Sequence, residues 1–309
     1  MDVKPLRILA LDGGGIRGIL TAAFLAHVEE RLQVRLVKHL GLLTGTSTGA
    51  ILALALASGM SAKEALEAYK EAGPLIFGQG RSRFFRWFRP AHDNTQLIRW
   101  LKSTFQEKTL NDSCVPIAIP TLEALTGRIR VWKKDHHPDL HEGGKKMWEV
   151  ALASAAAPTY LPPVQIEGLG TYLDGGLWAN NPSMVGLIEA RRYLGADFPS
   201  MRLLSIGTGR WQRHFRLQDV QQRGKLRWAP DVIEVVLAAQ ADAAHAQARL
   251  LMDPEHYLRI DEKLPHEIAL DDLREVATLE HLGREAGMQH LRDVKRLLLD
   301  GDLAKASAE

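Results

Sequence analysis

The strongest constraint on the fold is a pattern that occurs twice within the first sixty residues. A short apolar run leads into a glycine-rich turn, and the turn leads into an apolar helix. The first run is Leu6–Leu11, followed by three glycines and a helical stripe of apolar residues from Ile16. The second is Leu40–Leu43, followed by GTSTG (residues 45–49) and a helix over Ala50–Ala57. Strands that alternate with helices favour a mainly parallel sheet, so the sequence predicts an α/β fold.

The rest of the chain divides into two parts. Further apolar runs predict strands at Val115–Ile119, Ile129–Trp132 and Leu203–Ile206. From about residue 231 the pattern is alanine-rich and then charged, which predicts a helical segment that continues to residue 309. We therefore expect a single domain over residues 1–309, with the motifs confined to about residues 6–210.

Composition and charge exclude several classes of protein. The 309 residues carry a net charge of only +2, which is too small to indicate a nucleic acid polymer as partner. Cys114 is the single cysteine, so no internal disulfide can form. The start of the chain does not resemble a signal peptide, and the longest apolar run, Gly49–Met60, is too short to cross a bilayer. We expect a cytoplasmic protein whose membrane contact is peripheral.

The first glycine cluster has two interpretations. Gly13, Gly15 and Gly18 spell G-x-G-x-x-G, the pattern of a dinucleotide-binding loop. That fold also needs an acidic residue about 20 positions further on, where this chain has Val37–Leu40 (VKHL). The alternative is an oxyanion hole, in which unobstructed backbone amides of Gly13, Gly14 and Gly15 face a nucleophile. The loop after the next strand contains Ser47, a possible nucleophile, and this favours the oxyanion hole.

The second glycine cluster fits G-x-S-x-G, the pattern of a nucleophile elbow. Ser47 lies between an apolar strand and an apolar helix, flanked by Gly45 and Gly49 where side chains would clash. The helix N-terminus favours negative charge that develops on the serine hydroxyl. The alternative is a serine that only caps a helix after a glycine-rich turn.

A serine nucleophile needs a base, and the late histidines are poor candidates because most lie in charged helical segments. Asp174 is the better candidate, because it ends an apolar run and is followed by Gly175 and Gly176. A carboxylate within hydrogen-bond reach can act directly as the general base. The alternative is an ordinary Asp-Gly turn.

The motifs DGGGIRG, GTSTG and LDGG, in this order, resemble those of the patatin-like phospholipase family. The resemblance covers residues 6–210 and implies a three-layer α/β/α fold with a Ser-Asp dyad that hydrolyses lipid esters. It implies no catalytic histidine, no metal and no cofactor. Ser47 would be the nucleophile, Asp174 its base and Gly13 to Gly15 the oxyanion loop.

The resemblance also bears on other residues and on partners. Asp12 would be structural, and Arg17 would steady the glycine loop or meet a phosphate. Some bacterial members of the family are antiviral effectors that a cyclic dinucleotide activates. Because the helical segment after residue 231 has no assigned role, we expect the same kind of activation for this chain. The chain could also form a homo-oligomer. An alternative function is that of a carboxylesterase or thioesterase that acts on small soluble esters. A nucleotide-binding module that uses the glycine loop is a further, weaker alternative.

Two other segments carry competing interpretations. Arg81–Pro90 (RSRFFRWFRP) alternates arginines with aromatic residues, which is typical of a segment at a lipid surface and equally of aromatic residues packed beneath arginines. Asp135–Glu142 (DHHPDLHE) contains metal-ligand residue types, but Pro138 disrupts helical ligand spacing, so a solvated loop is favoured.

Overall fold

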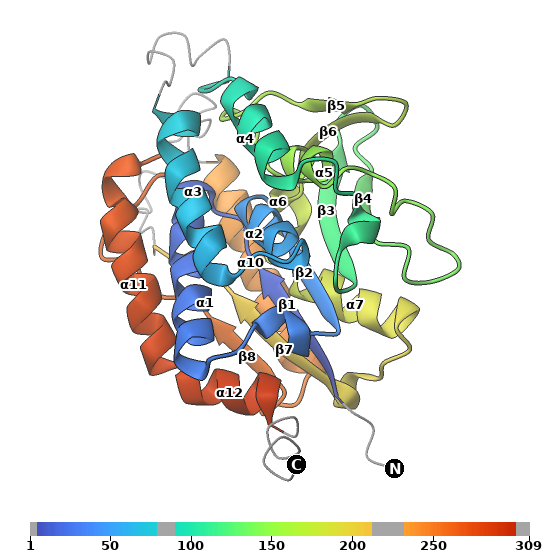
Figure 1. The fold of residues 1–309 in the computed structure, drawn as a ribbon, viewed down its shortest axis with the longest axis vertical. Helices are drawn as coiled ribbons and strands as arrows, with labels where there is room; N and C mark the ends of the chain where they lie inside the picture. The colour runs from blue at the N-terminus through green and yellow to red at the C-terminus, as the bar shows by residue number, and fades with distance from the viewer. Residues whose placement is uncertain (1–4, 79–89, 212–231, 301–309) are drawn as a thin grey trace, which may run out of the picture.

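The computed structural model describes residues 5–78, 90–211 and 232–300. A mixed sheet runs through the centre of this part of the chain, with strand order β5-β6-β3-β2-β1-β7-β8 and with β4 paired to β3 (Figure 1). The strands are β1 (Leu6–Leu11), β2 (Leu42–Gly45), β3 (Ile117–Glu123), β4 (Ile129–Lys133), β5 (Val164–Ile166), β6 (Gly170–Asp174), β7 (Met201–Ile206) and β8 (Tyr257–Ile260).

The centre of the sheet is parallel. β1 pairs in parallel with β2 and with β7, while β3 pairs in parallel with β2 and antiparallel with both β4 and β6. In this register Leu11 lies opposite both Gly45 and Ile206, so the three strands end at the same edge. Loops at the carboxyl edge of a parallel sheet are the usual location of a ligand site.

Helices cover both faces of the sheet. They are α1 (Gly18–Leu32), α2 (Thr48–Ala57), α3 (Ala62–Phe77), α4 (Thr95–Phe105), α5 (Met147–Ser154), α6 (Gly176–Ala179), α7 (Ser183–Tyr193), α10 (Val232–Leu251), α11 (Val276–Gln289) and α12 (Leu291–Leu299). Short 3-10 helices span Gly15–Arg17, Leu36–His39, Leu110–Asp112, Phe198–Ser200 and Leu273–Glu275. In Figure 1, α3, α1 and α11 lie side by side on one face.

Alternating side chains of β1 reach two separate cores, which confirms the three-layer α/β/α prediction. Leu9 and Leu11 pack into a large core with α1, α2, α3, α5 and α11. Ile8 and Ala10 pack on the other face with Leu187 of α7 and residues at the end of α10. A strand that is buried on both faces needs a continuous apolar run, and β1 has one over Ile8–Leu11.

Several boundaries differ from the prediction. The second strand lies at Leu42–Gly45 rather than Leu40–Leu43, so it continues directly into the serine-containing turn. The segment after residue 231 is mostly helical, as expected, but it also contains β8, which the pattern did not predict. β8 extends the parallel sheet beyond β7. Within the described ranges no helix is long and apolar enough to span a membrane.

Candidate active site

Ser47 occupies a sharp turn between β2 and α2. Its backbone has φ 55° and ψ −121°, a strained conformation for a residue with a side chain. A Cβ on Gly45 would lie 2.1 Å from the carbonyl oxygen of Gly49, and a Cβ on Gly49 would lie 2.2 Å from that of Leu11. Both flanking positions therefore require glycine, and the turn has the geometry of a nucleophile elbow.

Hydrogen bonds hold the elbow in place. The Ser47 N–H donates to Oγ of Ser154 at 3.1 Å, and Ser154 in turn donates to the carbonyl of Pro120 at 2.8 Å. The Ser47 carbonyl accepts from the N–H groups of Ala50 and Ile51 at the start of α2. The backbone of Ser47 is thus fixed from α5, β3 and α2.

Asp174 ends β6 and is buried, with 4% of its surface exposed. Its N–H donates to the carbonyl of Ala156 at 3.0 Å, and its Oδ1 accepts from the N–H of Gly176 at 2.7 Å. Burial raises the pKa of Asp174 from 3.8 to about 6, while hydrogen bonds from the Ser47 side chain and from Gly176 oppose that rise. A carboxyl with such a pKa is ionised at neutral pH and still basic enough to accept a proton.

The glycine loop lies against the elbow. A Cβ on Gly13 would come within 3.1 Å of Cβ of Ser47. The Gly13 N–H donates to the carbonyl of Asn180 at 3.0 Å, so this amide is already used. Among the described residues, the N–H groups of Gly14 and Gly15 find no acceptor. These two amides are therefore the loop donors that remain available to an oxyanion.

The neighbouring motif residues pack closely around this loop. A Cβ on Gly18 would lie 2.2 Å from Oγ1 of Thr48, and a Cβ on Gly175 would lie 2.2 Å from the carbonyl oxygen of Pro120. Nε of Arg17 lies 3.4 Å from the carbonyl oxygen of Gly14 and donates to it. This contact favours the interpretation in which Arg17 steadies the loop.

Asp12, just before the loop, forms a buried ion pair with Arg259 of β8. Arg259 Nη1 donates to Asp12 Oδ1 at 2.8 Å, and Nη2 donates to Oδ2 at 2.6 Å. Burial alone would lower the pKa of Arg259, but the carboxylates of Asp12 and Asp261 raise it above its ordinary value. The sequence pattern did not indicate Arg259, because it lies 247 positions from its partner.

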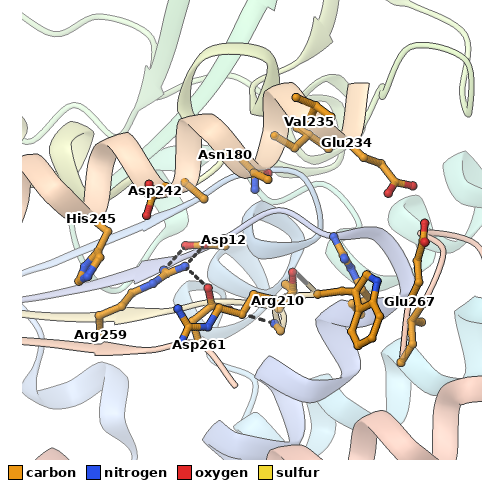
Figure 2. A pocket seen from close by; sticks show the side chains of 18 residues that line it. Asp12, Asn180, Arg210, Glu234, Val235, Asp242, His245, Arg259, Asp261 and Glu267 are labelled. Atoms are coloured by element: carbon orange, nitrogen blue, oxygen red, sulfur yellow. Dashed lines mark hydrogen bonds and ion pairs between the residues drawn. The ribbon is translucent and has the colours of Figure 1, made fainter. Parts of the chain in front are cut away.

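Two cavities meet at this edge of the sheet. Ser47 and Asp174 line a narrow cavity of about 50 Å³, whose other walls are mostly apolar. These walls include Ile51, Ile76, Phe77, Leu97, Leu161 and Leu237. A second cavity of about 520 Å³ is more polar and shares Asn180 and Leu237 with the first. Figure 2 shows this second cavity, with Asp12 facing Arg259 and with Asp242 and His245 projecting from α10.

The sequence pattern did not indicate Asn180 as a site residue, although it lies shortly after Asp174 in the segment WANNP (residues 178–182). Its side chain lines both cavities, and its buried Oδ1 accepts no hydrogen bond from the described residues. A Cβ on Gly176 would lie 3.0 Å from Oδ1 of Asp174 and 3.1 Å from Oδ1 of Asn180, so the two side chains are neighbours. Asn180 is a polar group that contributes to the walls of both cavities.

Two further segments carried competing interpretations in the sequence. Residues 81–89 of the arginine-aromatic segment lie outside the described residues. In the segment DHHPDLHE, the side chain of His136 is 5% exposed and its Nε2 lies 3.5 Å from a carboxylate oxygen of Glu189. Within the described ranges, no three His, Cys, Asp or Glu side chains are grouped so that they could hold a metal ion.

An elbow serine, a buried carboxyl and a glycine loop beside one apolar cavity are compatible with a hydrolase that uses a serine nucleophile. The sequence model of a family described as "Patatin-like phospholipase" matches residues 9–186. The chain belongs to the patatin-like phospholipase family and is a lipid acyl hydrolase.

Similar proteins occur in bacteria and plants. A "cGAMP-activated phospholipase" of Vibrio cholerae is 34% identical over 302 residues, covering 87% of this chain and 84% of the relative. One of the same description from Pseudomonas aeruginosa is 32% identical, covering 94% and 90%. "Patatin group J-1" of Solanum tuberosum is 26% identical, covering 99% and 87%. Among solved structures, VipD from Legionella pneumophila matches with a TM-score of 0.52 and 13% identity, covering 94% of this chain and 67% of VipD, which shows the fold alone.

Proposed function

We propose that this chain hydrolyses the acyl esters of phospholipids or lysophospholipids, with Ser47 as nucleophile and Asp174 as general base. The observation that carries the proposal is that both side chains line one apolar cavity. The Ser47 side chain donates a hydrogen bond to Asp174, and the raised pKa of Asp174 suits a group that accepts and returns a proton.

The reaction follows from these positions. Asp174 removes the hydroxyl proton as Oγ of Ser47 attacks the ester carbonyl carbon. The resulting oxyanion accepts hydrogen bonds from the N–H groups of Gly14 and Gly15, and Gly13 supports the loop through its bond to Asn180. When the tetrahedral intermediate collapses, Asp174 returns its proton to the leaving alcohol. Water, activated by the same carboxylate, then releases the fatty acid and regenerates Ser47.

The apolar lining of the site supports a lipid rather than a small polar ester. The apolar walls beside Ser47 suit an acyl chain, because burial of each methylene contributes about 0.8 kcal/mol. The larger polar cavity shares Asn180 with the apolar one and gives space to the polar part of the lipid.

The test is fatty-acid release from phospholipid vesicles by the wild type, Ser47→Ala and Asp174→Ala. We expect each variant to lose about 10³-fold or more in rate, because residues that act as a unit fail together. Ser58→Ala is the matched control, since that hydroxyl only donates to the carbonyl of Ala55 on α2. Substantial activity in Ser47→Ala would refute the proposed nucleophile.

We also propose that a cyclic dinucleotide activates the chain, as part of an antiviral response. Support comes from relatives described as cGAMP-activated phospholipases. The chain matches most of the length of each of these relatives. The measurement is vesicle hydrolysis with and without a panel of cyclic dinucleotides. Full activity without any nucleotide, unchanged when each is added, would refute the proposed activation.

A further inference from the structure

Arg259 is a buried cation with more than one acidic partner. It lies on β8, and only 9% of its side chain is exposed. Its Nη1 donates to Asp12 and to Oγ of Ser205, both at 2.8 Å. Its Nη2 donates to Asp12 at 2.6 Å and to Asp261 at 3.0 Å. The guanidinium is thus engaged by the protein itself, so Arg259 acts through its partners.

The first partner leads directly into the glycine loop. Asp12 directly follows β1, and its N–H donates to the carbonyl of Ile206 at 3.0 Å. Its carboxylate is held by two parallel hydrogen bonds from Arg259, a geometry that fixes orientation as well as position. Gly13 follows immediately, and after it come Gly14 and Gly15, whose amides find no acceptor in the described part of the chain.

The second partner reaches the same loop from the other side. Asp261 accepts a hydrogen bond from the N–H of Gly209 at 3.2 Å, in the turn after β7. In that turn, Oγ1 of Thr208 donates to the carbonyl of Gly13 at 3.1 Å. A Cβ on Gly14 would lie 2.1 Å from the same hydroxyl oxygen, so Thr208 packs directly against the loop. Arg259 therefore holds the loop through Asp12 and through the turn that contains Thr208.

We propose that Arg259 is a positioning residue that aligns the Gly14 and Gly15 amides for the oxyanion. This inference rests on the proposed function, in which those amides stabilise the transition state. Such stabilisation depends on donors that are already in position before the reaction, so a small displacement of the loop lowers the rate without weakening substrate binding. Lysine cannot replace Arg259 fully, because one amine does not reproduce the bidentate fork.

The experiment compares kcat and KM of Arg259→Met, Arg259→Lys and wild type on a soluble aryl ester and on phospholipid vesicles. We expect Arg259→Met to lose about 10²-fold in kcat, similar to the loss of one oxyanion donor, with KM changed less than threefold. Arg259→Lys should recover part of that loss. The rate of inactivation by an organophosphonate, which also forms an oxyanion on serine, should fall in parallel with kcat.

Lys133→Gln is the matched control, because it breaks another largely buried ion pair, Lys133 with Glu189 at 2.9 Å, outside the site. Its kcat per folded molecule should remain that of the wild type. If Arg259→Met does not fold, Arg259→Lys retains the buried charge, and its lower kcat at unchanged KM carries the test. A wild-type kcat per folded molecule in the Arg259 variants, with Ser47→Ala inactive, would overturn this inference alone. Activity in Ser47→Ala would overturn the proposed function and this inference together.

Discussion

The raised pKa of Asp174 predicts opposite effects on activity and on stability. Because the ionised carboxylate is the proposed base, kcat/KM should rise tenfold per pH unit below about pH 6 and then level off. With a pKa of about 6, about a tenth of Asp174 is ionised at pH 5 and about nine-tenths at pH 7. The assay measures hydrolysis of a soluble ester between pH 5 and pH 7, because the properties of vesicles themselves change with pH.

The same rise in the pKa of Asp174 means that its ionised form destabilises the folded state. The folded state holds the Asp174 proton up to about pH 6, whereas the ordinary value of 3.8 applies in the unfolded chain. The folded state therefore loses stability as the pH rises through this window, by about 3 kcal/mol as an upper bound. Asp174→Asn removes the charge and retains an oxygen that accepts from the Gly176 N–H. It should be inactive and yet more stable than the wild type at neutral pH.

Urea unfolding of the wild type and of Asp174→Asn at about pH 4 and about pH 7.5 tests this prediction. The variant should gain up to about 3 kcal/mol at the higher pH and almost nothing at the lower one. Glu255→Gln, which removes an exposed carboxylate, is the control and should stay within about 0.5 kcal/mol at both. A flat activity profile, or an Asp174→Asn variant that is not stabilised at neutral pH, would refute the reasoning.

Two further substitutions test the elbow and the loop. Gly49→Ala places a methyl group 2.2 Å from the Leu11 carbonyl oxygen, so thermal unfolding should show a loss of about 1–3 kcal/mol and the rate should fall at least about tenfold. Gly144→Ala, where a Cβ meets nothing within 4 Å, is its control. Tyr69→Phe removes the hydroxyl that donates to the Gly15 carbonyl at 2.8 Å. It should cost about 1–3 kcal/mol in stability and lower kcat, and an unchanged kcat would show that this bond does not position the loop.

The sequence predicted the parts of the molecule that local pattern determines. β1 lies at Leu6–Leu11 as expected, because a mainly apolar run that leads into a glycine-rich turn suits a strand buried on both faces. α2 covers the predicted Ala50–Ala57 and begins two residues earlier, at the turn itself. The elbow follows from short-range steric requirements, since its two glycines are needed for close approach of the backbone.

The parts that the sequence did not predict depend on contacts between distant segments. β8 has only four residues and follows a long helix, so its identity as a strand comes from pairing with β7. The hydrogen bond from the Gly13 N–H to the Asn180 carbonyl likewise joins two loops that are far apart in the chain. The glycine pattern identified the loop, but only the fold shows that the Gly13 amide has an acceptor while those of Gly14 and Gly15 have none among the described residues.

The motifs with proposed catalytic roles all lie before residue 210, yet part of the structure that supports them lies after it. Arg259 neutralises Asp12, and removal of one partner of a buried ion pair costs about 3–5 kcal/mol because the other charge stays buried. The carbonyl of Leu270 accepts from the N–H of Ile16 at 2.8 Å, directly after the glycine loop. β8 also covers the edge of β7, from which the turn that contains Thr208 projects. The segment after residue 231, to which no motif gave a role, is therefore part of the same structural unit as the active site.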